Sequence, residues 1–535
     1  MQPPPSVLIV GAGPVGLTTA LALQQAGVPG SAILVADQRP TRALTSVGSK
    51  ALSASASTLE VFRALGAADE LVAAGLPNGR AHFGAGRRLL DLGYDVLGTR
   101  YPFNMLVPQA RTEGILLRRC EEAGVRFAWG RRFVGLTQSA DEVCATFRPG
   151  EGGGEEEDET VRASWLVGCD GTGSAVRKAV GIPFDGTRAT QYGWLVDGHA
   201  DEDAPAIMGV PSHEGGRAMI FSTGEGRTGR RLMGKVPASE VVAGQRPAPP
   251  DLETVRAWAV RNFGTHYNFR DVVWTSVLGD GMRVAASFRS GRVFVAGDAA
   301  HQLFPAGGQG MNTGLLDATN LAWKLAMVIT GKTGAGREAV ERVLDSYTKE
   351  RLAAVKAVEH NIHMQTVSIW ASNEREKAVS DFMEEALNEP ALNKRWARRV
   401  CGFADPVEPY QLECAGLGQG EELVGTRLTY ILDTDTDNVI KAAKNSTFVV
   451  GFMAKWAVAE EQRHSIEQAV HLGGYSDKIR LLENSLNATD PKWDGVAAVL
   501  IRPDLRVAWV AREGSDIKTT QENFTKVVGW WIGGK

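Results

Sequence analysis

Three glycines and an acid near the amino end have the types and spacing of a dinucleotide-binding site. Gly11, Gly13 and Gly16 fit the pattern GxGxxG, directly after the apolar run 7–10 and before residues with helical spacing. In such a turn the first glycine permits the bend, the second lets a pyrophosphate approach the backbone, and the third lets helix and strand pack closely. Asp37 lies 21 residues after Gly16 (37 − 16), where a carboxylate accepts hydrogen bonds from ribose hydroxyls. FAD or NAD fits this site better than NADP, because a 2′-phosphate would face the carboxylate.

A second glycine-rich loop follows a buried strand in the middle of the chain. Residues 292–296 predict a strand that ends at Gly297 and Asp298, and the loop that follows carries residues 307–310 into a helix. Ligands bind at the carboxyl ends of strands in α/β sheets, and N–H groups at a helix amino terminus favour negative charge. The pyrimidine edge of an isoalloxazine ring becomes anionic on reduction. The loop therefore suits a flavin ring, with Asp298 accepting a hydrogen bond from a ribityl hydroxyl.

Three motifs, in this order, resemble the group A FAD-dependent aromatic hydroxylases, the single-component flavoprotein monooxygenases that include para-hydroxybenzoate hydroxylase, phenol hydroxylase and polyketide-tailoring hydroxylases. They are the amino-terminal glycine motif, residues 167–171 followed by Ser174 and Arg177, and the run 297–324. The resemblance covers about residues 6–365 well and the final 120 or so residues loosely. It implies that FAD is bound and that NADPH is a transient co-substrate at the surface.

The resemblance also assigns expected roles to single residues. Asp298 resembles the ribityl contact, Gln109 the glutamine that touches the FAD chain, and Asp170 part of the motif implicated in both the FAD pyrophosphate and NADPH. Lys50 stands where many relatives carry an arginine near the diphosphate; an ordinary exposed lysine is the alternative. Pro305 and residues 308–312 resemble the cradle of the ring. The expected FAD-binding residues are Gly11, Gly13, Pro14, Val15, Gly16, Asp37, Lys50, Gln109, Asp170, Asp298, Pro305, Gly308, Gln309, Gly310, Met311 and Asn312.

The activity that the resemblance implies is hydroxylation of an aromatic substrate, phenolic or polycyclic, such as a secondary metabolite. NADPH would reduce FAD, and O2 would be captured as a flavin C4a-hydroperoxide that transfers oxygen. The alternatives are another FAD-dependent oxidoreductase (an epoxidase, a Baeyer–Villiger-type oxygenase or a reductase) and a flavoprotein without enzymatic activity. A flavin-dependent halogenase would need a WxWxIP signature, which the sequence lacks. The pattern identifies no catalytic acid or base; we interpret His301 as structural.

Hydrophobic periodicity indicates the elements that must position these residues. Strand-like runs alternate with helical segments along the first part of the chain, which is typical of βαβ units. Expected strands are 7–10, 32–36 and 125–129, expected helices are 60–71 and 114–123, and residues 143–147 and 161–167 predict a hairpin with an acidic tip. Shorter alternating segments from 184 to 288 predict an antiparallel sheet. Apolar positions from 340 to 362 follow one face of a long helix.

We therefore predict an α/β protein with a Rossmann-like FAD-binding domain (1–183 and 289–370) and an inserted antiparallel β-sheet substrate domain (184–288). A helical linker (371–415) would lead to a C-terminal α/β domain (416–535) with a strand at 448–452, a helix at 457–472 and a hairpin at 496–509. The resemblance identifies this last domain as thioredoxin-like without a CxxC pair. Pocket candidates in the inserted sheet, for which plain core is the alternative, are Tyr192, Trp194, His213, Phe221 and Tyr267.

Composition limits the classes of partner. With 535 residues the chain has room for two to four structural units. Its 58 basic and 62 acidic residues give a net charge of −4, which leaves no electrostatic footprint for nucleic acid or an anionic membrane. The 5 cysteines are scattered and form no metal or redox pair. Without a signal peptide or an apolar run long enough for a bilayer, a cytoplasmic protein is expected, with a homodimer as the possible assembly.

Overall fold

A six-stranded, mainly parallel sheet forms the centre of the molecule. The computed structural model describes residues 3–40, 51–83, 89–149, 158–334, 336–371, 373–403, 423–454 and 460–533. Neighbouring strands of the central sheet are parallel except for the edge pair of β20 and β21. In spatial order the strands are β20 (Arg289–Ser290), β21 (Val293–Val295), β12 (Trp165–Gly168), β1 (Val7–Val10), β2 (Ile33–Asp37) and β8 (Arg126–Trp129). The predicted strands 7–10, 32–36 and 125–129 are thus confirmed to within a residue.

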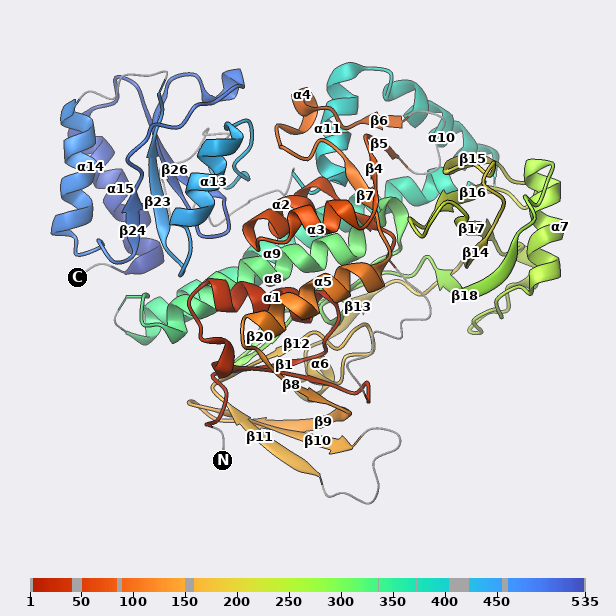
Figure 1. Ribbon diagram of the computed structural model, residues 1–535, viewed down its shortest axis with the longest axis horizontal. Helices are drawn as coiled ribbons and strands as arrows, with labels where there is room; N and C mark the ends of the chain where they lie inside the picture. Colours follow the sequence, from red (N-terminus) through yellow and green to blue (C-terminus); the bar gives the residue numbers. More distant parts are fainter. Residues whose placement is uncertain are drawn as a thin grey trace.

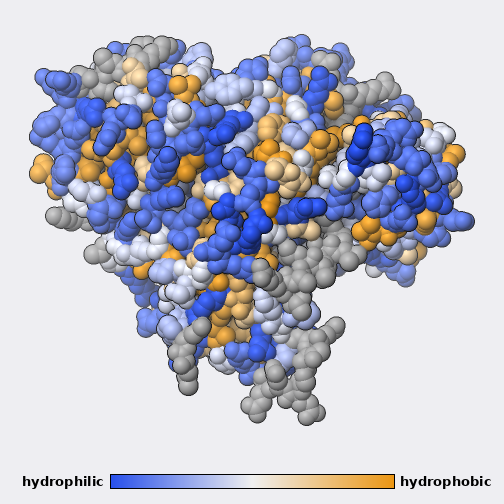
Figure 2. Space-filling view, viewed as in Figure 1, coloured by the Kyte–Doolittle hydropathy of each residue, from blue (hydrophilic) through white to orange (hydrophobic). Residues whose placement is uncertain are grey.

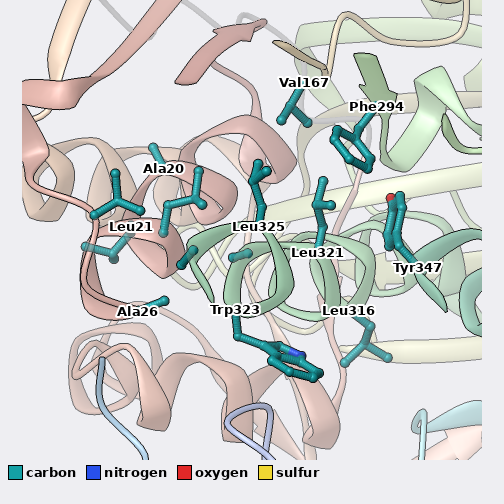
Figure 3. Packing of buried hydrophobic residues seen from close by; sticks show 14 of the residues in the cluster. Ala20, Leu21, Ala26, Val167, Phe294, Leu316, Leu321, Trp323, Leu325 and Tyr347 are labelled. Carbon is teal, nitrogen blue, oxygen red and sulfur yellow. The ribbon is translucent and has the colours of Figure 1, made fainter. Parts of the chain in front are cut away.

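Helix α8 (Gln309–Ile329) is buried on almost every side. Figure 3 shows it beside Ala20 and Leu21 of α1 (Pro14–Gln25), with Leu321 and Leu325 pointing toward Val167 and Phe294 of the sheet. On its opposite side, the Trp323 ring lies 5.1 Å from that of Trp531 near the carboxyl end of the chain. Because α8 packs against the sheet on one side and against C-terminal residues on the other, most of its residues are buried.

Two predicted elements are wrong in detail. The helix expected at 60–71 is two helices, α2 (Ala56–Ala64) and α3 (Ala68–Ala73), because the chain turns at Gly66 with a φ of 72°. The strand expected at 161–167 is also two. The first part, β11 (Glu159–Ala163), pairs with β10 (Val143–Pro149), whereas β12 belongs to the central sheet, and the exposed Ser164 separates them. Most of the acidic tip, residues 150–157, lies outside the described residues.

Smaller elements complete the amino-terminal half. Helix α5 (Gln109–Glu122), predicted at 114–123, begins five residues earlier. The strand β9 (Arg131–Gln138) completes the sheet of β10 and β11. The remaining elements are β3 (Ser53–Ala54), β4 (Leu76–Asn78), β5 (Arg80–His82), β6 (Leu89–Asp91), β7 (Asn104–Leu106), α4 (Tyr94–Leu97) and α6 (Ala175–Ala179).

A five-stranded antiparallel sheet lies at the right of Figure 1, as the alternation between 184 and 288 predicts. Its spatial order is β15 (Ile207–Pro211), β16 (Arg217–Ser222), β17 (Gly229–Lys235), β14 (Tyr192–His199) and β18 (Arg270–Gly279). One face packs on α7 (Leu252–Phe263) through Trp194, Val196 and Leu232. A small sheet of β13 (Phe184–Gly186), β19 (Arg283–Ala285) and β22 (His301–Gln302) joins this segment to the chain just after Asp298.

Long helices connect this sheet to the C-terminal part. Helix α9 (Arg337–Trp370) contains the predicted helical stretch and runs diagonally through the centre of Figure 1. It is followed by α10 (Glu374–Ala386) and α11 (Pro390–Val400). None of the helices in the described ranges combines the length and apolar character needed to span a membrane. The face shown in Figure 2 is mostly hydrophilic, with scattered hydrophobic residues.

The C-terminal elements form a separate four-stranded sheet, blue in Figure 1. Its spatial order is β24 (Ile479–Leu481), β23 (Phe448–Phe452), β25 (Val496–Ile501) and β26 (Val507–Arg512), with helices α13 (Asp433–Ala442), α14 (Glu460–Leu472) and α15 (Ile517–Ile532). Strands β23 and β24 are parallel, and the other pairs are antiparallel. The predicted strand 448–452 and the hairpin near Pro503 and Asp504 are confirmed.

A buried charged cluster joins α8, α9 and the turn between β25 and β26. Glu350 accepts hydrogen bonds from Lys324 Nζ at 2.8 Å and from Arg502 Nη2 at 2.9 Å. Arg502 also pairs with Asp504, and the four side chains are at most 6 % exposed. Burial raises the pKa of Glu350, but Arg502 and Lys324 outweigh it and hold the pKa well below its usual 4.5. Burial lowers the pKa of Lys324 to about 8 although Glu350 opposes the shift.

This charged cluster predicts that the folded protein loses stability at acidic pH. A carboxylate with a depressed folded-state pKa contributes stability above its unfolded pKa, and that contribution is lost as the pH falls toward the folded value. The free energy of unfolding of the wild type should therefore decrease as the pH is lowered below about 4.5. The difference in this free energy between the wild type and Glu350→Gln should become smaller as the pH is lowered from about 7 to about 3. Urea unfolding of both proteins at the two pH values measures this. If the difference in unfolding free energy is the same at both pH values, the lowered pKa of Glu350 is contradicted.

Candidate functional site

Of the three glycines in the amino-terminal motif, Gly11 and Gly16 have no room for a side chain, whereas Gly13 faces open space. A Cβ on Gly11, whose φ is 106°, would lie 2.4 Å from the carbonyl oxygen of Cys169, and one on Gly16 would lie 1.9 Å from that of Gly11. A Cβ on Gly13 would meet no atom within 4 Å, and Gly13 lines a cavity. Strand β1 and helix α1 are therefore in direct contact, while Gly13 leaves room at the amino terminus of α1 for a ligand.

Asp37 ends β2 and is held by neighbouring groups. Its Oδ2 accepts a hydrogen bond from the N–H of Ala12 at 2.6 Å, and its Oδ1 accepts one from Arg39 Nε at 3.0 Å. Arg39 Nη1 also lies 3.1 Å from Glu113 Oε2, and Gln109 donates to Glu113 at 2.7 Å. The chain thus brings Asp37 and Gln109 together through Arg39 and Glu113. The sequence analysis assigned no role to Arg39, although its position two residues after Asp37 was a signal.

The second loop presents glycines to the same cavity. Asp298 lies exposed in the short turn 297–299 and lines the cavity. Gly307 and Gly308 adopt left-handed conformations with φ of 68° and 65°, which a side chain would strain. A Cβ on Gly310, in the first turn of α8, would meet no atom within 4 Å. The loop therefore exposes backbone at the amino terminus of a long helix, where negative charge is favoured.

Two expected loop residues support the loop from behind. Asn312 Oδ1 accepts hydrogen bonds from the N–H of Ser55 at 2.8 Å and from Thr58 Oγ1 at 2.6 Å, and its Nδ2 donates to the carbonyl of Gly308 at 2.6 Å. Gln309 is 4 % exposed and donates to the carbonyl of Ala306. Neither side chain lines the cavity, so both hold the loop in place.

Asp170 caps a helix. Its Oδ2 accepts hydrogen bonds from the N–H groups of Ala175 at 2.7 Å and Val176 at 3.1 Å, and its Oδ1 accepts one from Ser174 Oγ at 2.6 Å. These bonds fix the amino end of α6, as a capping carboxylate does. Its neighbours Cys169 and Gly171 line the cavity, whereas Asp170 does not. Lys50 lies outside the described residues.

His301 belongs to a buried ion cluster beneath the loop. His301 Nε2 lies 2.7 Å from Asp317 Oδ2, Arg351 Nε lies 2.7 Å from Asp317 Oδ1, and the N–H of Gly297 donates to Oδ2 at 3.1 Å. The three side chains are at most 3 % exposed. Burial raises the pKa of Asp317, but His301 and Arg351 outweigh it and lower the pKa. The sequence analysis missed Asp317 and Arg351; an acid within an apolar helix was the signal.

Replacing Asp317 by asparagine should both destabilise the chain and loosen the site. Removal of one partner leaves buried cations uncompensated, at a cost of roughly 3–5 kcal/mol. Because Asp317 also accepts a hydrogen bond from the N–H of Gly297, the position of Asp298 should change, and the FAD that the sequence leads us to expect should be released faster. Urea unfolding and flavin fluorescence measure the two effects. The exposed Asp381 on α10 provides the control Asp381→Asn, and equal behaviour of the two variants would contradict the account.

One cavity of about 530 Å³ joins both loops to the five-stranded sheet. The expected site residues that line it are Gly13, Pro14, Val15, Gln109, Asp298, Pro305, Gly308, Gly310 and Met311. Those that do not are Gly11, Gly16, Asp37, Asp170, Gln309 and Asn312. The sheet contributes a mainly apolar wall that includes Leu195, Met219, Phe221 and Met233.

Of the five pocket candidates in the sheet segment, only Phe221 lines this cavity. Trp194 points to the other face, where its ring lies 4.6 Å from that of Trp258, and Tyr192 and Tyr267 pack against the same cluster. His213 is exposed in a turn. Among the described lining residues there is no histidine, tyrosine or lysine, so no general base is assigned.

The open glycine before α1, the acid at the end of β2 and the open glycine loop before α8 define the architecture of a dinucleotide-binding flavoprotein. The residues fit FAD, because Gly13 and Gly310 leave space where a Cβ would intrude, and both helix termini favour an anionic ligand. The chain belongs to the FAD binding domain family, whose model matches residues 5–362.

The names of similar proteins support the same class of protein. The chain is 31% identical over 507 residues, 94% of this chain and 93% of the relative, to "Uncharacterized aromatic compound monooxygenase YhjG" of Bacillus subtilis (strain 168). It is 31% identical to the "12-dehydrotetracycline 5-monooxygenase/anhydrotetracycline 6-monooxygenase" of Streptomyces rimosus, with 98% of each chain covered. The solved structure of OxyS anhydrotetracycline hydroxylase from Streptomyces rimosus superposes with a TM-score of 0.78, at 28% identity and 99% coverage of each chain. The expected class, an FAD-dependent monooxygenase, is thereby confirmed.

Proposed function

We propose that the protein hydroxylates an electron-rich aromatic compound, phenolic or polycyclic, with NADPH as electron donor and O2 as oxidant. The observation that supports this most directly is that the glycine loop before α8 and the apolar face of the five-stranded sheet line the same cavity. A flavin ring against the loop and an aromatic compound against the sheet would share one space. An apolar wall excludes water from such a space, which protects the oxygen transfer.

FAD supplies the electron transfer from NADPH and the activation of O2. In the balanced reaction NADPH and a proton provide two electrons, one oxygen atom enters a ring C–H bond as a hydroxyl group, and the other leaves as water. The residues of the chain bind FAD and the substrate and orient them. Gly13 gives a pyrophosphate access to the amino terminus of α1, the backbone of 307–310 favours negative charge beside the ring, and Phe221 and Met233 hold the acceptor.

The residue assignments for FAD remain proposals. Nine residues would touch FAD from the cavity wall, and Asp37, which is fixed by Arg39, would accept from the ribose. Asp170, Gln309 and Asn312 would act by fixing the backbone around the ligand. Lys50 keeps its proposed place near the diphosphate.

The domain division is also a proposal: an FAD-binding domain of 1–183 and 289–370, a substrate domain of 184–288, a linker of 371–415 and a C-terminal domain of 416–535. The parallel pair β23 and β24 next to the antiparallel hairpin β25 and β26 supports a thioredoxin-like arrangement. Its proposed role is packing against α8. The homodimer also remains a prediction, which light scattering tests by measuring the molar mass in solution.

Steady-state oxidation of NADPH tests the function. The FAD-loaded protein is given a panel of phenols, naphthols and polycyclic quinones while NADPH loss, O2 uptake and hydrogen peroxide are followed. At least one compound should accelerate NADPH loss and O2 uptake together and yield a product whose new oxygen comes from O2. Reduction of a compound without O2 uptake would favour a reductase. NADPH loss recovered entirely as hydrogen peroxide with every compound would contradict hydroxylation.

A further inference from the structure

Two consecutive helices, α10 and α11, pack on one hydrophobic cluster in the upper part of Figure 1. The residues that α10 contributes to this cluster are Met383 and Leu387, and those of α11 are Trp396, Ala397 and Val400. Because a helix has 3.6 residues per turn, side chains about two positions away from these point away from the cluster. The outer faces of both helices therefore belong to the surface of the chain.

The outer face of α10 exposes large apolar side chains next to acidic ones. Phe382 is 68 % exposed and Val379 is 48 % exposed, and their spacing of three positions places them side by side on the helix. Glu374 and Glu385 are exposed about three helical turns apart, on the adjoining side. An exposed aromatic ring with charged residues beside it is typical of a protein interface, in which a polar rim surrounds an apolar centre.

The outer face of α11 is basic. Arg395 and Arg399 are exposed and lie four positions apart, a spacing at which like charges destabilise a helix. Partial burial and the nearby charge of Arg395 both lower the pKa of Arg399. The Arg399 guanidinium also lies 4.8 Å from the centre of the Trp396 ring. The helix thus holds two positive charges close together at the surface, which favours an acidic partner.

These acidic and basic residues are complementary, yet they do not meet within one chain. In the ranges that the structure describes, none of the four charged side chains on the outer faces forms an ion pair with an opposite charge. A partner of a single charge sign would match one helix and be repelled by the other. A second copy of the chain, turned by 180°, matches both helices at once, because each surface in a two-fold interface meets the other surface of the partner.

We infer that the outer faces of α10 and α11 form a homodimer interface, in which α10 of each copy packs against α11 of the other. Phe382 and Val379 form the apolar centre of each half. At the rim, the glutamates of α10 in one copy pair with the arginines of α11 in the second copy. An aromatic anchor at the centre contributes most of the affinity, and the charge pairs fix the orientation of the two copies.

The interface also supports the cavity. Ile369 at the end of α9 and Val400 at the end of α11 both line it, and α10 and α11 make up most of the chain between these two residues. A second copy that covers α10 and α11 therefore restrains the segment that carries both lining residues. The inference does not depend on the proposed function.

The molar mass in solution tests the inference. Sedimentation equilibrium of the full-length protein over a range of concentrations gives the Kd of the dimer, and the wild type should approach twice the chain mass of 57.4 kDa. Phe382→Asp places a charge at the centre of the interface and should raise this Kd roughly 30-fold or more, the range for a central aromatic anchor. Leu472→Asp is the matched control, since Leu472 is 77 % exposed at the end of α14, and it should leave the Kd unchanged.

Charge reversal identifies which helices meet. Arg395→Glu/Arg399→Glu makes the face of α11 acidic, so this variant alone should be monomeric. Glu374→Lys/Glu385→Lys makes the face of α10 basic, so it should be monomeric as well. An equimolar mixture of the two should form dimers again, because each α10 then meets an α11 of opposite charge. This recovery excludes misfolding as the cause of dissociation, and it decides the question even if Phe382→Asp fails to fold.

Three results would overturn the inference. They are a wild type that is monomeric at every concentration, a dimer that none of the variants on α10 and α11 weakens, and a mixture of the two charge-reversed variants that stays monomeric.

Discussion

Gly13→Ala is expected to weaken FAD binding roughly 100-fold, or about 2.7 kcal/mol, while the chain without FAD keeps its stability. A Cβ at this position meets no protein atom within 4 Å, and the backbone at φ −74° and ψ −178° accepts alanine without strain. The added methyl group would project into the space at the amino terminus of α1, where the pyrophosphate is expected to approach the backbone. Fluorescence titration of the apoprotein with FAD measures the affinity, and urea unfolding measures the stability.

Gly16→Ala is the matched control, since it adds the same methyl group on the protein side of the turn. Its Cβ would lie 1.9 Å from the carbonyl oxygen of Gly11, so strand and helix must separate. The cost should be roughly 3 kcal/mol or more in the free energy of unfolding of the apoprotein. If Gly13→Ala bound FAD as the wild type does, the cofactor would not lie at this turn.

Arg502→Met is expected to lower the free energy of unfolding by roughly 3–5 kcal/mol, the range for breaking a buried ion pair. Arg502 contacts Glu350 with both Nη atoms, at 3.1 and 2.9 Å, and it also pairs with Asp504. Its removal therefore leaves both buried carboxylates without the cation that they share, and Lys324 pairs with Glu350 alone. The guanidinium also lies 5.2 Å from the ring centre of Trp323 on α8, so packing between α8 and the C-terminal sheet is lost as well. The loss should appear in urea unfolding at neutral pH.

The exposed Arg480 on β24 offers a matched arginine in the same sheet. Arg480→Met should change the free energy of unfolding by about 0.5 kcal/mol or less. In a double-mutant cycle, Glu350→Gln combined with Arg502→Met should cost less than the sum of the two single changes, because the two residues share one interaction. Similar effects of Arg502→Met and Arg480→Met would show that the cluster does not fasten the C-terminal residues to α8.

Local patterns were sufficient for the elements that carry the two glycine loops. Strand β1 and helix α1 are encoded by neighbouring residues, since an apolar run, a glycine turn and helical spacing follow one another within 25 residues. The same holds for the strand and loop around Asp298. The helix expected at 60–71 failed because helical periodicity continues across Gly66 although the chain turns there.

Contacts between distant residues could not be predicted from such patterns. Asn312 carries a motif position, yet its bonds to Ser55 and Thr58 span more than 250 residues and make it a support rather than a cavity residue. Glu350 and Arg502 are 152 residues apart, and nothing near either one indicates a partner. In the inserted sheet, alternation indicates two faces but not which one meets the cavity. Trp194 was therefore a pocket candidate although it lies in the core.

The central claim is that the turn at Gly13 and the loop at 305–311 hold one FAD molecule between them. A crystal structure of the FAD complex tests this directly. The account predicts the pyrophosphate at the amino terminus of α1 beside Gly13 and the isoalloxazine ring against Gly308 and Gly310, with the apolar wall of the five-stranded sheet across the cavity. Density for the ring at any other place, or a chain that takes up no FAD, would contradict it.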